Sequence, residues 1–391
     1  MKILVVCQYY FPEPFKVADV CEALVSKGHE VDVVTSFPNY PMGEIYEGYR
    51  RKKHKNETIN GVNVHRVFTI GRRTGFFWRT LNYYVFSIAS TMYVSRIKKD
   101  YDVVFVYQLS PVLMSKAAIK YKRQHNKKML IYCLDLWPDS LTLGGVKKDG
   151  IIYKYYKKVS GNIYNNADKI LVSSNMFRQY FDGVFGISAD EVDYLPQYAE
   201  DVFQPSEMAD DNITDITFAG NIGTTQSIET IIYAAEKLRD KNIHFHFYGD
   251  GSGLSKMTSL AEKLDLVNVT FHGRIPVEKV PEKYAESDAL IVTLSDNPVL
   301  SMSFPGKIQT YMAAGKPIIA SVNGEAAEII KAADCGFCAP AEDVDGLVDC
   351  IERFLDSDKI TLGKNARRYY EANFQKDDFI NRLITELEKL V

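Results

Sequence analysis

Lys307 stands near the start of a predicted helix, where its residue type and its position together suggest chemistry. Pro305 and Gly306 favour a turn, apolar residues follow at helical spacing, and Gly315 ends the segment before an apolar run. Backbone N–H groups at a helix N-terminus lack intrahelical partners and carry the positive end of the helix dipole. Together with the Lys307 amine, they are suited to bind an anion. An ordinary helix with an exposed lysine is the alternative interpretation.

Glycine-rich turns follow three predicted strands in the second half of the chain. They are Gly220-Asn221-Ile222-Gly223, Gly249-Asp250-Gly251 and Gly273-Arg274-Ile275. Glycines at a strand-to-helix turn let the backbone approach a phosphate, and exposed backbone groups in the third turn could read a base edge. The second turn lacks the spacing of a dinucleotide fingerprint, and no acidic residue for a ribose follows about 20 residues later. Plain tight turns remain the alternative.

In the first half of the chain, Asp135 and Trp137 directly follow the apolar run that ends at Leu134. A carboxylate at the carboxyl end of a strand can orient or deprotonate a hydroxyl, so Asp135 is a candidate for acting on a substrate. A helix N-cap and a core tryptophan are the alternative. Glu13 and Lys16, in the loop after the first predicted strand, are further candidates on the same side.

The patterns do not predict a metal site. His244 and His246 lie on one face of a predicted strand, and Cys335-x-x-Cys338 lacks a second pair, so both are interpreted as core positions. Asp343-Val344-Asp345 stands where a helix begins and is explained by capping. We therefore expect neither a bound metal nor a cofactor.

Composition restricts the class of protein. A chain of 391 residues, 46% of them hydrophobic, is long enough for two domains with buried cores. With 47 basic and 50 acidic residues the net charge is -3, which gives no bulk attraction to nucleic acid. Six scattered cysteines do not form a disulfide scaffold, and the N-terminus lacks the apolar region of a signal peptide. These features indicate a cytoplasmic protein.

Apolar runs alternate with helical segments along the whole chain, which is the pattern of parallel α/β sheets. A polar and acidic stretch between residues 196 and 215 divides the alternation. We therefore predict an N-terminal domain (1–197) and a C-terminal domain (198–375), both doubly wound and facing across a cleft that is lined by the carboxyl ends of their sheets. The predicted strands are 3–6, 31–35, 62–67, 103–107, 129–134, 169–173, 192–195, 216–219, 244–248, 269–272, 289–293 and 318–320.

Two segments of the first half have special composition. Residues 36–60, rich in Pro, Gly, Tyr and charge, are predicted to form a long loop. Residues 76–94 are predicted to form a helix that is too polar to span a membrane. This helix either packs on the sheet, which is the interpretation we prefer, or lies on an anionic membrane. Its apolar face comprises Phe77, Leu81, Tyr84, Val85, Ile88 and Met92, and basic residues precede and follow this face.

Taken in order, these motifs resemble family-4 retaining glycosyltransferases of the GT-B fold. The resemblance is closer to the bacterial branch of O-antigen and capsule enzymes that includes L-fucosamine transferases. It runs nearly end to end through Phe-Pro-Glu-Pro-Phe (11–15), Gly-His-Glu-Val (28–31), Pro-Asn-Tyr-Pro (38–41), Val-Tyr-Gln-Leu-Ser-Pro (106–111), Leu-Asp-Leu-Trp-Pro-Asp-Ser (134–140), Phe-Ala-Gly-Asn-Ile-Gly (218–223), Gly-Asp-Gly (249–251) and Lys-Ile-Gln-Thr-Tyr-Met-Ala-Ala-Gly-Lys-Pro (307–317).

The resemblance implies an α/β GT-B fold with two Rossmann-like domains, an acceptor-binding N-terminal domain and a C-terminal domain that binds a nucleotide sugar. It also implies that a last helix, 376–391, packs back on the first domain. Asp135 and Lys307 are the expected catalytic residues. The expected donor-binding residues are Gly220, Asn221, Gly223, Asp250, Gly251, Arg274, Ile275, Gly306, Lys307, Ile308 and Thr310, and the acceptor-side candidates are Glu13, Lys16 and Trp137.

The chain departs from the wider family at three positions. That family carries two glutamates separated by seven residues, whereas Met302 and Thr310 occupy the corresponding places here. The family also often has a histidine where this chain has Leu134.

The expected reaction moves a sugar, an N-acetylated aminosugar, from a UDP-sugar to a polyprenyl-linked saccharide acceptor, with retention of anomeric configuration. UDP-sugar is a substrate here, and no cofactor is implied. A peripheral contact with the inner face of an anionic membrane is a further expectation. Two alternatives remain open at this point: a GT-B sugar-nucleotide epimerase, and a non-catalytic membrane-associated scaffold, which the two missing glutamates motivate.

Overall fold

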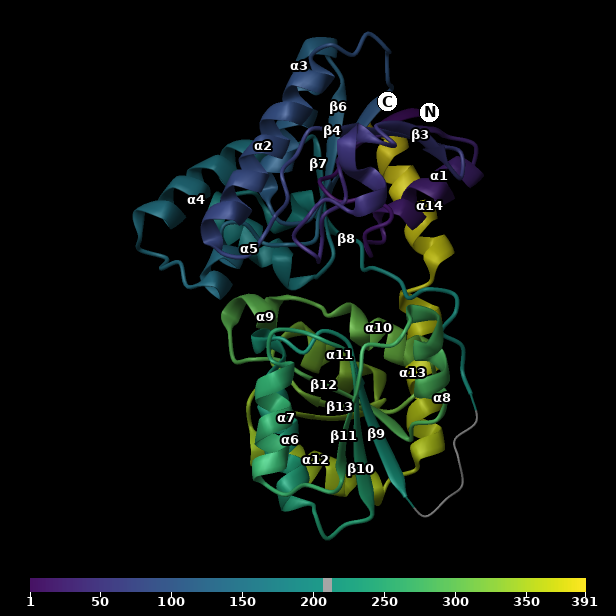
Figure 1. Cartoon of the computed structure of the whole chain (residues 1–391). Coiled ribbons are helices and arrows are strands. Elements are labelled where there is room, and N and C mark those ends of the chain that lie inside the picture. Colours follow the sequence, from purple (N-terminus) through teal and green to yellow (C-terminus); the bar gives the residue numbers. More distant parts are fainter. Residues whose placement is uncertain (207–212) are drawn as a thin grey trace. The chain divides into compact units, whose positions relative to one another are not determined.

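The chain is built around two separate β-sheets. The computed structural model describes residues 1–206 and 213–391, and contacts between residues divide the chain into two compact units, shown in Figure 1. Unit 1 comprises Met1–Leu195 and Ile380–Val391, and unit 2 comprises Pro196–Phe379. The acidic part of the predicted inter-domain stretch, residues 207–212, lies outside the described residues.

Unit 1 contains an eight-stranded sheet in the order β3-β4-β2-β1-β5-β6-β7-β8. All neighbouring strands are parallel except β3 and β4, which pair antiparallel. The strands are β1 (Lys2–Val6), β2 (Glu30–Ser36), β3 (Asn56–Ile59), β4 (Val62–Val67), β5 (Val103–Gln108), β6 (Lys128–Cys133), β7 (Lys169–Val172) and β8 (Val192–Tyr194). The helices are α1 (Val17–Ser26), α2 (Phe76–Val94), α3 (Ser115–His125), α4 (Ile151–Tyr164) and α5 (Met176–Phe185), with short helices η1 (Glu47–Lys52), η2 (Val112–Met114), η3 (Asp139–Gly144) and η4 (Ala189–Glu191).

Unit 2 contains a six-stranded, fully parallel sheet in the order β11-β10-β9-β12-β13-β14. The strands are β9 (Thr214–Ala219), β10 (Ile243–Tyr248), β11 (Val269–Gly273), β12 (Ala289–Thr293), β13 (Ile318–Ser321) and β14 (Gly336–Ala339). The helices are α6 (Ile228–Lys237), α7 (Leu254–Lys263), α8 (Val280–Ala285), α9 (Pro298–Met302), α10 (Gly306–Ala313), α11 (Glu325–Ala333), α12 (Val344–Leu355) and α13 (Lys359–Asn373), with η5 (Thr224–Gln226) and η6 (Val277–Lys279).

The order of strands in unit 2 creates a switch point. From β9 the chain winds outward through β10 and β11, and from β12 it winds the other way through β13 and β14, while β9 and β12 are neighbours. Sheets of this kind bind ligands at such a switch point, at the carboxyl ends of the neighbouring strands from which the loops diverge. The Gly220 turn follows β9, so topology places it at this switch point.

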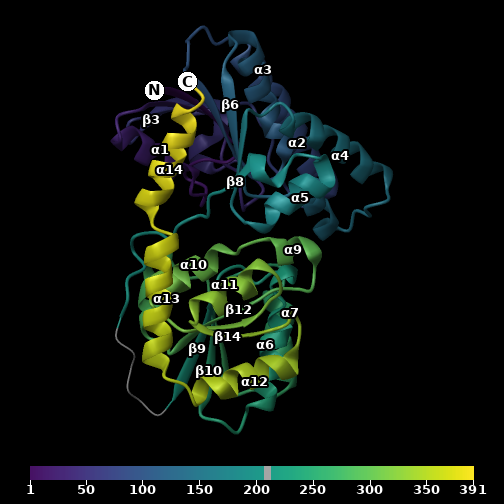
Figure 2. The ribbon, with the colours of Figure 1, turned by 180° about the vertical axis from the view of Figure 1, so that it is seen from behind.

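The last helix, α14 (Lys376–Glu388), carries the chain from unit 2 back to unit 1 (Figure 2). Leu383 and Leu387 are buried, and the Arg382 guanidinium donates a hydrogen bond to the Tyr194 carbonyl at 2.6 Å. Burial of two leucines holds the end of the chain on unit 1.

The predicted loop 36–60 is wrong in its second part, where β3 forms an edge strand. β3 is short, polar and largely exposed, so it shows no apolar alternation. The local signal is the turn that follows: Asn60 and Gly61 both have positive φ (47° and 83°), as a two-residue hairpin turn requires. Strand β14 also has no counterpart among the predicted strands.

Helix α2 forms where predicted, but its predicted apolar face is not the face that packs. Phe77, Leu81, Ile88 and Met92 are exposed. The buried residues are Asn82, Tyr83, Phe86, Ser87, Ser90 and Val94. The polar members of this set are satisfied by hydrogen bonds, because Ser87 donates to the Leu113 carbonyl at 3.0 Å and Asn82 donates to the Ile70 carbonyl at 2.6 Å.

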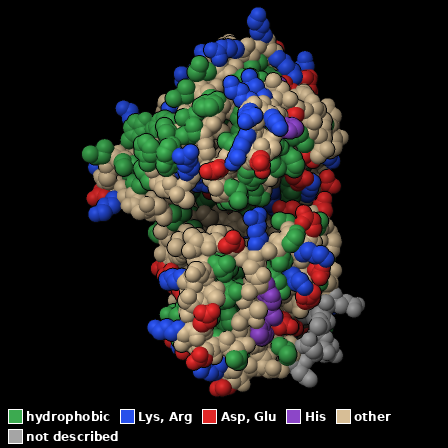
Figure 3. Space-filling view, viewed as in Figure 1, with side chains coloured by type: hydrophobic (Ala, Val, Ile, Leu, Met, Phe, Trp, Pro, Cys, Tyr) green, Lys and Arg blue, Asp and Glu red, His purple; other side chains and the backbone are tan. Residues whose placement is uncertain are grey.

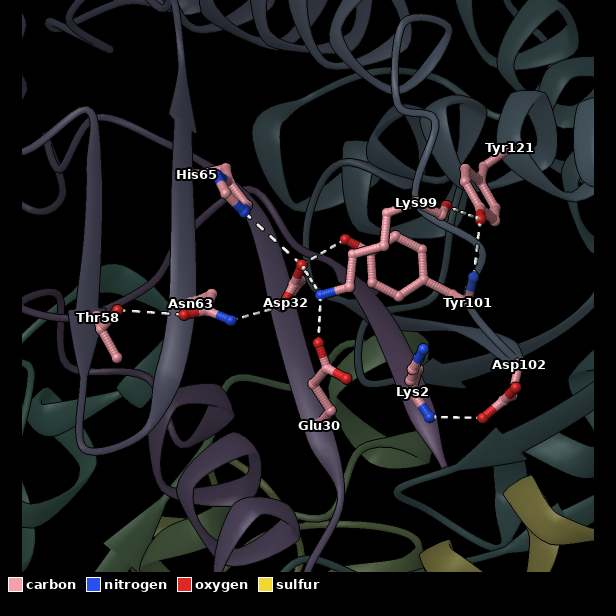
Figure 4. A network of polar contacts seen from close by, with 10 residues as sticks. All are labelled: Lys2, Glu30, Asp32, Thr58, Asn63, His65, Lys99, Tyr101, Asp102 and Tyr121. Carbon is pink, nitrogen blue, oxygen red and sulfur yellow. Dashed lines mark hydrogen bonds and ion pairs between the residues drawn. The ribbon is translucent and has the colours of Figure 1, made fainter.

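A polar network joins β2, β4 and the segment before β5 in unit 1 (Figure 4). The buried carboxylate of Asp32 accepts hydrogen bonds from Asn63 (2.9 Å), Lys99 (2.7 Å) and Tyr101. Burial opposes ionisation of Asp32, but its hydrogen-bonding neighbours, His65 included, outweigh burial and hold its pKa well below the ordinary value. The network therefore fixes three segments that are distant in sequence.

Candidate active site

The turns after β9, β10 and β11 meet at the carboxyl end of the unit 2 sheet. The Gly220 N–H donates to the Tyr248 carbonyl at 2.8 Å, and the Gly249 N–H donates to the Gly273 carbonyl at 2.8 Å. A Cβ atom at Gly249 would lie 1.8 Å from the Gly220 carbonyl oxygen, so only glycine fits there. Three of the predicted donor-binding turns are thus in direct contact with one another or with the neighbouring strand end.

The Lys307 side chain runs along the first of these turns. A Cβ atom at Gly220 would lie 2.5 Å from Lys307 Cε. The Lys307 amine donates to Gln226 Oε1 at 2.7 Å and lies 3.7 Å from the centre of the Phe218 ring. Among the described residues, no ion pair with a carboxylate is formed by this amine, and burial lowers its pKa to about 7. The arrangement is suited to an anionic ligand that would supply the missing negative charge.

Helix α10 begins directly beside this lysine. Gly306, its first residue, is exposed, and Pro305 precedes it in an extended conformation. The Ile308 side chain is fully buried in the core, and its N–H donates to the Pro305 carbonyl at 3.0 Å. The Thr310 hydroxyl donates to the Lys307 carbonyl at 2.8 Å. Of these positions, Gly306 and Lys307 are therefore the ones best placed to contact a ligand.

The remaining predicted donor residues line the same turns. Asp250 is exposed, and its carboxylate accepts from the Gly251 N–H at 2.7 Å. The exposed Asn221 side chain lies against Gly223. Arg274 is exposed directly after β11, whereas Ile275 is half-buried against the core. The structure thus brings the predicted donor residues together in unit 2, and their roles toward a ligand stay predictions.

Gln226 and Phe218 are two members of this site that the motifs did not single out. Phe218 belongs to the apolar run of β9, which sequence reasoning assigns to the core, and it is buried. Its ring nevertheless forms the floor beneath the Lys307 amine, where the ring quadrupole attracts a cation. Gln226 ends η5, and its only sequence signal is its place a few residues after a glycine turn.

In unit 1, Asp135 follows β6 and is held by the neighbouring loop. Its carboxylate accepts from the Ser110 N–H at 2.9 Å, and its carbonyl accepts from Gln108 Nε2 at 2.9 Å. Burial raises the pKa of Asp135, and the nearby positive charge of Arg72 opposes that rise. Trp137 is buried and donates from Nε1 to Ser110 Oγ at 2.8 Å. Trp137 is therefore a core tryptophan, as the alternative interpretation had it, whereas the Asp135 side chain is half-buried.

Arg72 is a further charged residue near Asp135, and its sequence position indicates only that it belongs to the basic residues before α2. Its guanidinium donates to the Tyr83 hydroxyl at 3.2 Å and lies over the rings of Tyr40 and Tyr83, at 5.4 and 5.9 Å. Its backbone N–H donates to Asn39 Oδ1 at 3.2 Å. Arg72 thus brings a positive charge, framed by tyrosines, close to Asp135.

Glu13 is buried rather than open to solvent. Its carboxylate accepts from the backbone N–H groups of Tyr10 (3.2 Å), Asn39 (2.8 Å) and Tyr40 (2.7 Å). Burial raises its pKa to about 7, and these three hydrogen bonds oppose the rise. The contacts describe a residue that ties the loop after β1 to the loop after β2, and a contact with an acceptor stays untested. Lys16 is half-buried at the N-cap position of α1.

The candidate metal ligands are accounted for by other contacts. Among residues 1–206 and 213–391, no group of three or more His, Cys, Asp or Glu is arranged to hold a metal ion. Asp343 caps α12 by accepting from the Gly346 N–H at 2.9 Å. His244 and His246 are half-buried and not in the core, and His246 lies between Asp215 (2.8 Å) and His272 (3.0 Å).

None of the helices in the described ranges combines the length and the apolar composition that crossing a membrane requires.

Comparison with known families matches both halves of the chain. Residues 17–197 match the family described as Glycosyltransferase Family 4, and residues 200–376 match Glycosyl transferases group 1. The putative colanic acid biosynthesis glycosyl transferase WcaI of Escherichia coli K12 is 24% identical over 414 residues, which cover 99% of this chain and 100% of that protein. The probable glycosyltransferase WbjE of Pseudomonas aeruginosa is 26% identical over 306 residues, 75% of each chain.

Solved structures share the fold over the full length. Sucrose-phosphate synthase from Thermosynechococcus elongatus superimposes with a TM-score of 0.77 at 18% identity, covering 100% of this chain and 98% of that one. HepE from Anabaena, solved in complex with UDP-glucose, has a TM-score of 0.71 at 14% identity, with 100% of both chains covered. The chain therefore carries a Family 4 glycosyltransferase domain followed by a group 1 glycosyl transferase domain, and these form the two Rossmann-like halves of a GT-B glycosyltransferase.

Proposed function

We propose that this protein transfers a sugar from a UDP-sugar to a polyprenyl-linked saccharide during synthesis of a surface polysaccharide, with retention of anomeric configuration. The sugar that we expect is an N-acetylated aminosugar. The observation that carries the proposal is the Lys307 amine, which lies against the Gly220 turn and at the start of α10, with no carboxylate partner among the described residues. A diphosphate is the anion that such a site suits best, because its two phosphates can use both the amine and the backbone N–H groups.

Relatives support the choice of donor and pathway. HepE has been solved with UDP and with UDP-glucose, and its fold covers the whole of this chain. WcaI is named for colanic acid biosynthesis, and WaaG, a structural neighbour with a TM-score of 0.70, is described as involved in lipopolysaccharide biosynthesis. These names motivate both the UDP-sugar and the polysaccharide in our proposal.

In the proposed reaction, the bond between the sugar and the diphosphate breaks through an oxocarbenium-like transition state, and negative charge builds on the leaving diphosphate. The Lys307 ammonium and the N-terminus of α10 would stabilise that charge. Removing one donor that is aimed at developing charge typically lowers the rate by about a hundredfold or more. Asp135 is the residue that we expect to orient a sugar hydroxyl, since it follows β6 at the carboxyl end of the unit 1 sheet and its carboxylate is held by the Ser110 N–H.

The test is calorimetric titration of the protein with UDP, GDP and ADP, repeated on Lys307→Ala and on the longer apolar variant Lys307→Met. We expect selective UDP binding that weakens at least tenfold in both variants, about 1.4 kcal/mol. The matched control is Lys263→Ala, an exposed lysine of α7 in the same unit, which should bind UDP as the parent protein does. If none of the three nucleotides binds, the donor site is wrong and the non-catalytic scaffold becomes the better reading.

The reaction class is tested separately by turnover. A UDP-sugar screen with a polyprenyl-linked acceptor should give a glycosylated lipid, and NMR of the new linkage should show the anomeric configuration of the donor. Formation of an isomeric UDP-sugar in the absence of acceptor would instead identify an epimerase.

A further inference from the structure

Many of the exposed apolar side chains of unit 1 lie on two helices and on the turn before the second one. Within these segments the most exposed are Ile151 (87%), Phe77 (67%) and Ile88 (59%). Figure 3 shows green side chains collected over the part of unit 1 where Figure 1 labels α2 and α4. We define the α2/α4 surface as Phe76, Phe77, Trp78, Leu81, Ile88 and Met92 of α2, Leu143 of η3, and Ile151, Ile152 and Tyr155 of α4.

The two helices contact each other, so their exposed residues form one surface. The hydroxyl of Tyr84 on α2 donates to the hydroxyl of Tyr155 on α4 at 3.3 Å, and the hydroxyl of Tyr156 donates to that of Tyr84 at the same distance. Below them, the Trp137 ring packs edge-on against Tyr156, with ring centres 5.4 Å apart. A rigid, tyrosine-linked support therefore presents the apolar side chains.

The same segments are strongly basic, although the whole chain has a net charge of -3. Residues 72–99 and 143–158 contain eleven Lys or Arg and a single acidic residue, Asp149. Lys99 and Lys148 pair with carboxylates of other segments, and the Arg72 guanidinium is held among tyrosines near Asp135, which leaves eight basic residues, all of them exposed. Positive charge is thus concentrated around the apolar surface.

On α4 the two properties share one face of the helix. Ile151, Lys154, Tyr155 and Lys158 follow at helical spacing, and all four are exposed. Just before α2, the guanidinium of Arg73 lies 4.7 Å from the centre of the ring of Trp78, a residue of that helix. Apolar side chains with interleaved lysines fit the boundary between lipid headgroups and acyl chains, where the amines meet phosphates and the apolar groups leave water.

A groove extends this surface along α2. It has a volume of about 410 Å³ and is lined by Phe68, Val85, Ile88 and Met92, with Lys55 and Arg96 among its basic residues. Such a groove is complementary to a phospholipid, because its apolar lining matches an acyl chain and its basic residues match the phosphate.

We propose that the α2/α4 surface docks unit 1 on an anionic bilayer, with α4 and the start of α2 at headgroup depth. This inference rests on the proposed function in that it places the acceptor-binding unit on the surface where a polyprenyl-linked acceptor resides. An apolar helix face alone would fit a protein partner as well, but the surplus of positive charge favours an anionic surface.

The experiment is flotation of the full-length protein with vesicles of phosphatidylcholine alone and with about one third phosphatidylglycerol, without nucleotide. We expect binding to the anionic vesicles that weakens steeply with salt, since each Lys or Arg near such a surface contributes about 1 kcal/mol. Two variants test the two halves of the chemistry: Ile151→Ser with Ile152→Ser, and Lys154→Glu with Lys158→Glu. Each double variant should lower the partition coefficient at least tenfold.

Matched controls are Val267→Ser, an equally exposed apolar residue of unit 2, and Lys263→Glu on α7. Both should bind vesicles as the parent protein does. UDP affinity and melting temperature should be unchanged in all variants, because the altered side chains are exposed and outside the donor site. Equal binding to neutral and anionic vesicles, or no binding at all with UDP affinity intact, overturns the docking surface and leaves the donor site standing. A concentration-dependent dimer that the Ile151→Ser, Ile152→Ser variant abolishes would also overturn it, in favour of a second copy of the chain.

Discussion

Lys307 brings an amine into a partly buried site, where its neighbours are a glutamine, an aromatic ring and glycine backbone. Burial lowers its pKa from 10.5 to about 7, so near neutral pH the unliganded site holds the charged and the neutral amine in comparable amounts. A bound diphosphate would favour the charged form, and binding should therefore be linked to protonation.

From this linkage we predict proton uptake when UDP binds at pH 8.5. The free amine is largely neutral above its pKa, so binding the anion should draw close to one proton from the buffer. Calorimetric titrations in two buffers with different ionisation enthalpies measure the uptake. Lys307→Met should show none, and its UDP affinity should be less dependent on pH. Equal binding enthalpies in both buffers for the parent protein would contradict the assignment.

The lowered pKa of Lys307 also makes the stability of the folded protein depend on pH. Between pH 7 and 10.5 the folded site has released its proton while the unfolded chain retains it, so the free energy of unfolding rises with pH across this window. Below pH 7 the Lys307 amine is charged in the folded protein, and the full cost of burying this charge then lowers the free energy of unfolding. A functional anion site is the kind of place where such a cost is retained.

At the scale of elements, the Asp32 network of Figure 4 shows how distant segments are fixed in register. Its carboxylate joins β2 to Asn63 and His65 of β4 and to Lys99 and Tyr101 before β5. The network lies at the start of β2 and not at the carboxyl edge of the sheet, so we assign it a structural role.

We predict that Asp32→Asn lowers the free energy of unfolding of unit 1 by about 3 kcal/mol, because it removes the buried negative charge that the Lys99 amine and the Tyr101 hydroxyl contact and leaves Lys99 paired with Glu30 alone. The pKa of Asp32 is lowered in the folded state. Its contribution is therefore complete above the ordinary value of 3.8 and is lost only as pH falls through the lower folded value. Urea denaturation at pH 7 and at successively lower pH measures both effects. The control Asp240→Asn, at an exposed turn, should change little, and an equal loss in both variants would argue against the network.

Helices α2 and α4 illustrate a second point at this scale. Helical periodicity identifies which residues share a face, but α2 buries Asn82, Ser87 and Ser90 instead of its larger apolar residues. Hydrogen bonds to carbonyl groups of the surrounding loops make this possible. The apolar face is then left for another contact, which is the basis of the membrane proposal.

For the molecule as a whole, the predicted donor residues of unit 2 come from four separate stretches of chain that meet at the carboxyl end of one sheet. The chain returns from unit 2 to unit 1 through α14, so both ends of the sequence belong to unit 1. A ligand that binds these turns is expected to stabilise the unit that contains them by mass action.

Hydrogen exchange with and without saturating UDP tests this location. We predict slower exchange of backbone N–H groups in residues 220–226, 249–253 and 306–310, because a bound diphosphate occupies groups that water otherwise reaches. Helix α12 (Val344–Leu355), in the same unit, serves as the internal reference and should not change. If UDP slows hydrogen exchange in other segments but in none of these three turns, the nucleotide binds elsewhere.

Sequence alone was sufficient for every strand except β3 and β14, and for the positions of the glycine turns and of Lys307. The physical reason is local: buried parallel strands require continuous apolar runs, and turns after such strands require glycine or proline. The edge strands β3 and β14 were absent from the prediction, since β3 is polar and β14 (Gly-Phe-Cys-Ala) begins with a glycine and contains no β-branched residue.

Only the tertiary structure decided what each candidate side chain faces. It buried Glu13 under three backbone N–H groups, placed Trp137 in the core, and brought Arg72 close to Asp135. It also turned the apolar face of α2 outward beside α4. These outcomes depend on contacts between residues far apart in the chain, and a sequence pattern fixes the period of an element but not the partner that its faces will meet.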